Sequence, residues 1–120
     1  MSRDYKKLKV FHQVNDLVID IYRVTESFPK NEMFGLISQI RRAAVSAAAN
    51  IVEGSYRSTL KEYLQFLNIS LSSLAEVGYY IELSHTLNYM NDEKHRRLSE
   101  KQHLCVRILN ALISSLKSKA

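Results

Sequence analysis

Two Glu-x-x-His pairs are the residues of this chain whose types and spacing could perform chemistry. Glu82 precedes His85 by three residues, and Glu100 precedes His103 by the same step. Di-iron carboxylate proteins use two such pairs with two further glutamates, all aimed into the core of a helical bundle. On a helix, however, Glu100 and His103 lie roughly 140–200° from Leu98 and its apolar stripe. We therefore expect no metal site, with His85 packed and hydrogen-bonded and the second pair on a solvated face.

Other common signatures of enzymes and cofactor sites are missing from the sequence. Only three glycines occur, and none are paired at the spacing of a phosphate-binding loop, which argues against a nucleotide-binding fold. No segment resembles the nucleophile elbow of a hydrolase. We therefore expect a non-enzymatic protein with no catalytic residues and no cofactor.

A regular row of polar side chains is the second candidate site. This polar seam repeats at steps of three and four residues and comprises Gln39, Arg42, Ser46, Asn50, Glu53 and Arg57. Such a row is either an ordered hydrogen-bond seam between packed helices or a ligand-binding surface. Because Ala43 and Ala49 beside it are small, a neighbouring helix can come close. We expect most of the seam to be buried and bonded to other helices or subunits, with a charged or amide partner for Arg42 and for Glu53.

Basic side chains form the third candidate site. The net charge of +5 permits contact with nucleic acid or an anionic surface, and it is equally consistent with ordinary solubility charge. The candidate nucleic-acid contacts are Lys6, Lys7, Lys9, Arg41, Lys94, Arg96 and Arg97. Because no RNA-reading motif is recognisable, contact would be mainly with phosphate. We expect the group at residues 94–97 to contribute more than Arg41, and the group at residues 6–9 to do so more weakly.

Long helices are expected to position all of these residues. Few prolines and glycines and an apolar spacing of three and four predict helices over about 9–27, 32–54, 60–87 and 92–117. Pro29 ends the first helix, and Gly54 is predicted to cap the second in the left-handed conformation. Thr59 with Glu62 forms a capping box for the third, and Asn91 caps the fourth. Short connections favour a single all-α domain, an antiparallel up-down-up-down four-helix bundle.

The third predicted helix carries two apolar stripes on nearly opposite sides. The first comprises Leu60, Leu64, Leu67, Leu71, Leu74 and Ile81. The second comprises Phe66, Ile69, Tyr80, Leu83 and Leu87. A helix at the edge of a four-helix monomer needs only one buried stripe, so the second predicts a wide groove or another subunit. We take the second stripe as the candidate oligomer interface.

Cysteine usage and hydropathy point to the cytoplasm. Cys105 is the only cysteine, so no internal disulfide is possible, which fits a reducing compartment. The first ten residues carry charge without a following apolar segment, so we expect no signal peptide. No run approaches the ~18 apolar residues of a membrane helix, and we expect no membrane partner.

A long pattern around the polar seam resembles the 23S rRNA intervening-sequence protein family. It comprises Phe28-Pro29, Glu32, Gly35-Leu36, Ser38 to Ala43, Ser46, Asn50-Ile51 and Glu53-Gly54, and it continues through Glu62 and Phe66-Leu67 to Ser73-Leu74-Ala75-Glu76. The similarity covers nearly the whole chain, and a run of this length is specific. Ala48 and Ser72 depart from the family's usual Pro and Gly, and Val77-Gly78-Tyr79-Tyr80 stands where Leu-Glu-Thr-Gln is usual.

The resemblance implies a four-helix bundle that assembles into a ring-like homopentamer and, by the family's name, a link to rRNA intervening sequences. A ring would repeat each basic patch and so increase the number of phosphate contacts. Our hypothesis is a non-enzymatic oligomeric bundle that binds structured RNA or a ribonucleoprotein through basic patches. The alternative is a protein-interaction scaffold, or an accessory subunit of a nucleic-acid enzyme such as a reverse transcriptase. Accessory variability determinants of diversity-generating retroelements, which resemble this family in fold, suggest that alternative.

Overall fold

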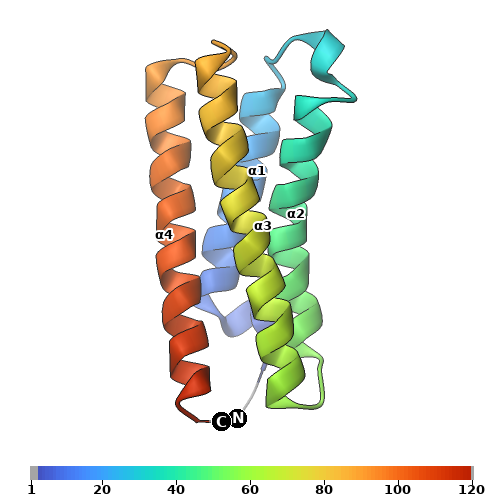
Figure 1. Cartoon of the computed structure of the whole chain (residues 1–120), viewed down its shortest axis with the longest axis vertical. Coiled ribbons are helices and arrows are strands. Elements are labelled where there is room, and N and C mark those ends of the chain that lie inside the picture. Colours follow the sequence, from blue (N-terminus) through green and yellow to red (C-terminus); the bar gives the residue numbers. More distant parts are fainter. Residues whose placement is uncertain (1–2, 120) are drawn as a thin grey trace.

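Residues 3–119 of the computed structural model form four long α-helices and two short 3₁₀ turns, with no β-strand (Figure 1). The elements in chain order are η1 (Tyr5–Lys7), α1 (Lys9–Thr25), η2 (Lys30–Glu32), α2 (Leu36–Ser55), α3 (Leu60–Thr86) and α4 (Asp92–Lys117). The all-α prediction is confirmed. Figure 1 shows both termini and the α2–α3 connection at one end, and the α1–α2 and α3–α4 connections at the other. None of the helices in this part of the chain has the length and apolar character of a membrane span.

The predicted helix caps of α3 and α4 are present. The Thr59 side chain accepts a hydrogen bond from the Glu62 backbone N–H at 3.1 Å and donates one to Glu62 Oε1 at 3.0 Å. Asn91 Oδ1 accepts from the Lys94 N–H at 2.8 Å. These bonds satisfy N–H groups that have no partner within the helix, which is why both helices begin where their cap residues predict.

The predicted start of α2 at residue 32 is wrong, because Glu32 lies outside the helix. α2 begins at Leu36, and Glu32 Oε1 accepts the Leu36 N–H at 3.1 Å. Its other oxygen accepts a hydrogen bond from the Tyr89 hydroxyl at 2.8 Å. The bond from Leu36, followed by that from Tyr89, lowers the pKa of Glu32. Glu32 therefore caps α2 from the preceding turn and ties the α1–α2 connection to the α3–α4 connection.

Gly54 does not form the predicted left-handed cap. It lies inside α2, and none of the three glycines has a positive φ. A Cβ at this position would lie 2.9 Å from Phe66 Cβ and 3.1 Å from Tyr63 Cδ1. The missing side chain, rather than an unusual backbone conformation, is what this glycine contributes, because it lets α2 and α3 approach closely.

The core contains side chains from all four helices, but the buried stripe of α3 differs from the predicted one. Its members are Tyr63, Leu67, Ser70, Ser73, Leu74, Val77, Ile81 and Ser84. Leu60, Leu64 and Leu71 are only partly buried. Ser70 donates to the Ala47 carbonyl at 2.7 Å, which allows a hydroxyl at a core position. Because these polar residues interrupt the apolar pattern of α3, the predicted apolar stripe does not coincide with the face of the helix that is buried.

Candidate nucleic-acid interface

Basic residues gather at the end of the bundle that holds both termini. Three segments reach this end: residues 3–9, residues 53–62 around the α2–α3 connection, and residues 117–119 at the end of α4 (Figure 1). Arg3 joins the first two, because its Nη1 donates to the Arg57 carbonyl at 2.7 Å and the Thr59 carbonyl at 3.5 Å. We call these three segments the basic end.

The basic end accounts for the net charge of the protein. It holds eight of the 17 lysines and arginines, namely Arg3, Lys6, Lys7, Lys9, Arg57, Lys61, Lys117 and Lys119. It holds three of the 12 acidic residues, namely Asp4, Glu53 and Glu62. The difference is +5, equal to the whole net charge, and the nine basic and nine acidic residues elsewhere cancel. Positive potential is therefore concentrated at one end of the molecule.

Most cations of the basic end are exposed. Seven of its eight cations are exposed, and the eighth, Arg3, is partly buried. The ion pairs seen within residues 3–119 all lie outside the basic end. The backbone around Lys6 is held in place, because Asp4 accepts its N–H at 3.0 Å and His12 Nε2 lies 2.6 Å from its carbonyl. These cations are therefore available to an anionic partner.

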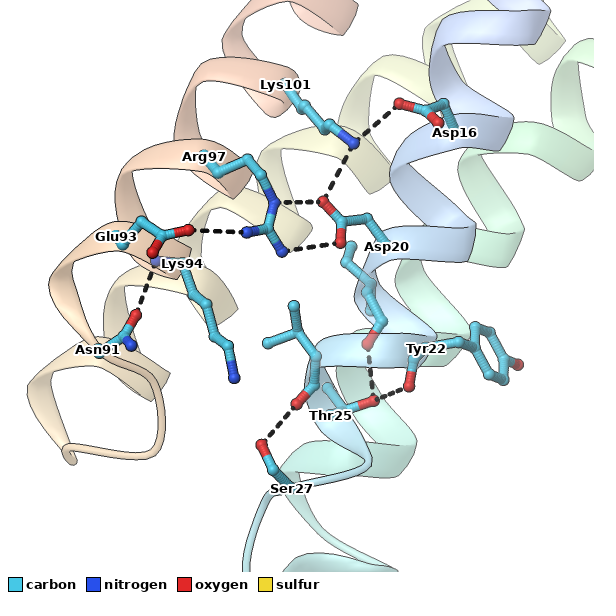
Figure 2. A network of polar contacts seen from close by, with 12 residues as sticks. Asp16, Asp20, Tyr22, Thr25, Ser27, Asn91, Glu93, Lys94, Arg97 and Lys101 are labelled. Atoms are coloured by element: carbon cyan, nitrogen blue, oxygen red, sulfur yellow. Dashed lines mark hydrogen bonds and ion pairs between the residues drawn. The ribbon is translucent and has the colours of Figure 1, made fainter.

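The predicted group at residues 94–97 is less available. Arg97 donates from Nε and Nη2 to the two oxygens of Asp20, both at 3.0 Å, and its Nη1 lies 3.5 Å from Glu93 Oε1 (Figure 2). Arg96 forms a looser pair with Glu100 at 3.8 Å. Because carboxylates already occupy these guanidinium groups, we now expect the basic end to supply more phosphate contacts than this group.

Arg41 is also occupied by intramolecular contacts. Its Nε donates to Thr25 Oγ1 at 2.9 Å and its Nη2 to the Tyr22 carbonyl at 3.2 Å. Its guanidinium lies over the Tyr22 ring, 4.6 Å from the centroid. Arg41 thus holds the last turns of α1 against α2 and satisfies a carbonyl near the helix end.

A charged network between α1 and α4 was not predicted. Lys101 Nζ lies 2.9 Å from Asp16 Oδ2 and 3.1 Å from Asp20 Oδ2. Hydrogen bonding from Arg97, and secondarily the bond and charge of Lys101, outweighs desolvation and lowers the pKa of Asp20. Figure 2 shows these side chains meeting between the two helices. The sequence does hold a signal for this network in its residue spacing. Asp16 and Asp20 are four residues apart, as are Arg97 and Lys101, so each pair lies on one face of its helix and the two pairs can meet in register.

The polar seam lies along the boundary between α2 and α3. Ser46 Oγ is 2.9 Å from Ser73 Oγ, and Asn50 Nδ2 donates to the Ser46 carbonyl at 2.8 Å. Arg42 Nη2 donates to Gln39 Oε1 at 3.0 Å and approaches Glu76 Oε2 at 3.4 Å. The predicted amide and charged partners of Arg42 are therefore present. Hydrogen bonds between the two helices give the seam a structural role.

The predicted burial of the seam fails within the single chain. The exposed members are Gln39, Arg42, Glu53 and Arg57. Within residues 3–119 no side chain pairs with the Glu53 carboxylate, so its predicted partner is absent from the bundle. These four side chains face outward because they lie beyond the part of α2 that α3 covers. Burial of these side chains against another subunit stays a prediction.

The candidate oligomer interface on α3 is partly open in the single chain. Ile69 and Leu87 are 48% and 44% exposed. Phe66 is partly covered by the Arg57 guanidinium at 4.7 Å, and Leu83 is half-buried. Tyr80 donates its hydroxyl to Glu76 Oε2 at 2.9 Å. An apolar strip with such exposure can contact another subunit, and that contact stays a prediction.

The two Glu-x-x-His pairs are separate in the structure. Glu82 bonds His95 at 2.9 Å, and His85 bonds Asp92 at 2.8 Å, while the two imidazole rings stack at 3.9 Å. These contacts join the end of α3 to the start of α4. The second pair, Glu100 and His103, is exposed as the helical spacing predicted. In the part of the chain that the structure describes, no three His, Cys, Asp or Glu side chains are grouped to hold a metal ion.

Comparisons with known proteins agree with this architecture. The profile of the family described as 23S rRNA-intervening sequence protein matches residues 6–111. No curated protein matches the chain. A solved structure of a protein with unknown function from the S23 ribosomal protein family of Bacteroides thetaiotaomicron is similar in fold, with a TM-score of 0.82 and 21% identity over 95% of this chain and 99% of that chain. Because the profile spans most of the sequence, this chain belongs to the 23S rRNA-intervening sequence protein family.

Proposed function

We propose that this protein is a non-enzymatic RNA-binding bundle whose basic end contacts the phosphates of a structured RNA or a ribonucleoprotein. The observation that carries the proposal is the charge distribution, because the basic end has a net charge of +5 and the remainder of the chain is neutral. Phosphate neutralisation supplies most of the sequence-independent affinity for nucleic acid. The family's name suggests rRNA intervening sequences as the RNA.

The chemistry of the basic end favours phosphate contact over base reading. Six of its seven exposed cations are lysines, which act as point charges on flexible stems rather than as planar forks. Contacts with phosphate position a protein on RNA without reading its sequence. Discrimination between RNA sequences should therefore be poor, and discrimination by shape somewhat better.

The proposal includes an antiparallel up-down-up-down bundle that assembles into a ring-like homo-oligomer, for which a pentamer follows from the family resemblance. The alternation of connections between the two ends supports the helix order. The half-exposed Ile69 and Leu87 support assembly through α3. A ring would present several copies of the basic end to one RNA and increase the number of phosphates contacted.

Salt dependence tests the proposal. The seven exposed cations of one basic end predict a log–log slope of roughly −5 to −6 if all of them contact phosphate, at 0.7–0.9 per contact. Replacing Lys6, Lys7 and Lys9 together by Gln should reduce that slope by about 2 to 3. The measurement is fluorescence anisotropy of a labelled RNA hairpin between about 50 and 400 mM salt. Over this range the screening of charge–charge interactions by salt increases strongly.

A matched control removes the same charge elsewhere. Arg23, Lys30 and Arg107 are exposed and form none of the observed ion pairs. Their triple replacement by Gln should change the slope by less than about 1, since they lie outside the basic end. A flat salt response, or an equal loss in both triple variants, would refute the phosphate mechanism. Absence of binding at low salt would favour the protein-scaffold alternative.

A further inference from the structure

Tyr56 is an uncovered aromatic side chain at the basic end. Its residue is 77% exposed, although it follows directly after the buried last turn of α2. Its backbone is fixed, because the Tyr56 N–H donates to the Glu53 carbonyl at 3.2 Å and the next N–H donates to the Gly54 carbonyl at 3.1 Å. A rigid backbone thus presents an open aromatic ring to solvent.

Two arginines of the basic end stack on aromatic rings of α3. The guanidinium of Arg57 lies over the Phe66 ring at 4.7 Å, and that of Arg3 lies over the Tyr63 ring at 5.0 Å. Stacking on these rings restricts where the two arginines can point. Surfaces that bind single-stranded nucleic acid combine these two features, with aromatic rings for bases and cations for the backbone.

Other exposed aromatic rings lack this setting. Phe34 is 95% exposed, but it lies in the α1–α2 connection at the opposite end of the bundle. Tyr22 is occupied by Arg41, whose guanidinium is 4.6 Å from its centroid. Tyr5, within the basic end, packs its ring against Phe11 at 4.9 Å. Tyr56 is therefore the ring of the basic end that is open to a ligand.

We propose that Tyr56 stacks on an unpaired base while the cations of the basic end hold the flanking phosphates. This inference rests on the proposed function and narrows its RNA to one that presents a single-stranded loop, bulge or end. In a continuous A-form duplex the bases are already stacked and their faces are closed to a side chain. An exposed ring has a binding partner in RNA only where bases are unpaired, so duplex binding uses the cations alone.

The test compares wild-type protein with Tyr56→Ala and Tyr56→Phe on two RNAs. One is a single-stranded ten-nucleotide RNA carrying 2-aminopurine, and the other is a blunt duplex of equal length. Tyr56→Ala should weaken single-strand binding about 5- to 150-fold, the range measured for one base stacked on an aromatic residue. It should leave duplex binding and the salt slope unchanged, because no cation is lost. Tyr56→Phe should retain single-strand binding, and 2-aminopurine fluorescence should be quenched by wild type and not by Tyr56→Ala.

Controls separate failure of this inference from failure of the proposed function. Phe34→Ala, which removes an exposed ring from the other end, should bind both RNAs as wild type does. If Tyr56→Ala binds the single strand normally while the Lys6, Lys7 and Lys9 triple variant does not, the stacking inference falls and phosphate binding stands. If wild type binds neither RNA at low salt, the proposed function itself falls. A smaller particle mass for Tyr56→Ala by light scattering would instead assign the ring to a contact between copies and overturn the inference.

Discussion

Replacing Asp20 by Asn should destabilise the protein by about 2 kcal/mol. Asp20 is 12% exposed and accepts two hydrogen bonds from Arg97 at 3.0 Å and one from Lys101 at 3.1 Å. Hydrogen bonds to charged groups contribute about 1.5–3 kcal/mol each when a partner is left unpaired. The loss should fall well below the sum of the three contributions, because Arg97 is 39% exposed and Lys101 31% exposed, so water can rehydrate both cations.

The expected thermal shift follows from chain length. An unfolding entropy of about 2.1 cal/mol/K per residue gives about 0.25 kcal/mol/K for a chain of this size, so about 2 kcal/mol lowers Tm by about 8 °C. The matched control is Glu100→Gln, which removes the pair with Arg96 at 3.8 Å, where both side chains are about two-thirds exposed. Such surface pairs contribute at most about 0.5–1 kcal/mol, so this variant should shift Tm by less than about 4 °C.

Acid should reduce the difference between wild type and Asp20→Asn. The hydrogen bond from Arg97 is the main cause that holds the folded pKa of Asp20 below its ordinary value of 3.8. A lowered folded pKa means that the carboxylate contributes stability above pH 3.8 and loses it as pH falls through the lower, folded value. The Asn variant has no carboxylate at this position to protonate, so its contribution there does not change with pH.

Urea unfolding followed by circular dichroism measures both effects. Free energies of unfolding for wild type, Asp20→Asn and Glu100→Gln should be compared at pH 7 and at pH 3 or below. A loss below about 0.5 kcal/mol at pH 7 for Asp20→Asn, or an equal loss in the control, would refute the argument that burial sets the strength of this network. A difference from wild type that stays constant into acid would refute the assigned pKa direction.

Two further predictions concern assembly and thiol chemistry. Light scattering at micromolar concentration should give a multiple of the 13.9 kDa chain mass, and a single 13.9 kDa species for wild type would contradict this. Ile69→Glu should give smaller particles with unchanged helicity, since a charge in a buried contact is costly. Burial raises the pKa of Cys105 to about 12, so iodoacetamide at pH 8 should modify the folded protein slowly and the urea-unfolded protein readily, and fast modification of the folded protein would count against the buried position.

Local patterns in the sequence were sufficient to predict the helices. The cap residues Thr59 and Asn91 begin α3 and α4 as predicted, because a cap depends on a hydrogen bond only three residues away. The errors occur where a distant contact decides the outcome. Glu32 is positioned outside α2 and bonded to Tyr89 from another connection, and Gly54 is needed for packing against Phe66 of the next helix.

The buried face of α3 shows the same limit. Its heptad stripe contains Ser70 and Ser84, which an apolar pattern cannot identify as core positions. Each hydroxyl donates to a backbone carbonyl in the folded chain, at 2.7 Å in both cases. Burying these serines therefore leaves no hydroxyl donor without a partner. α3 also packs against both α2 and α4, so the face that these neighbours cover is broader than one apolar stripe. This packing exists only once the four helices have assembled.

The sequence by itself determined the family, the four helices and the number of charges, whereas the tertiary structure decided which charges are available. In the sequence alone Arg97 and Arg41 look as accessible as Lys6, but facing helices supply Asp20 and Tyr22 to occupy them. Conversely, the basic end is formed by three segments that are distant in sequence. Charge pairing acts over a few ångströms between side chains, and only the packed arrangement of helices sets those distances.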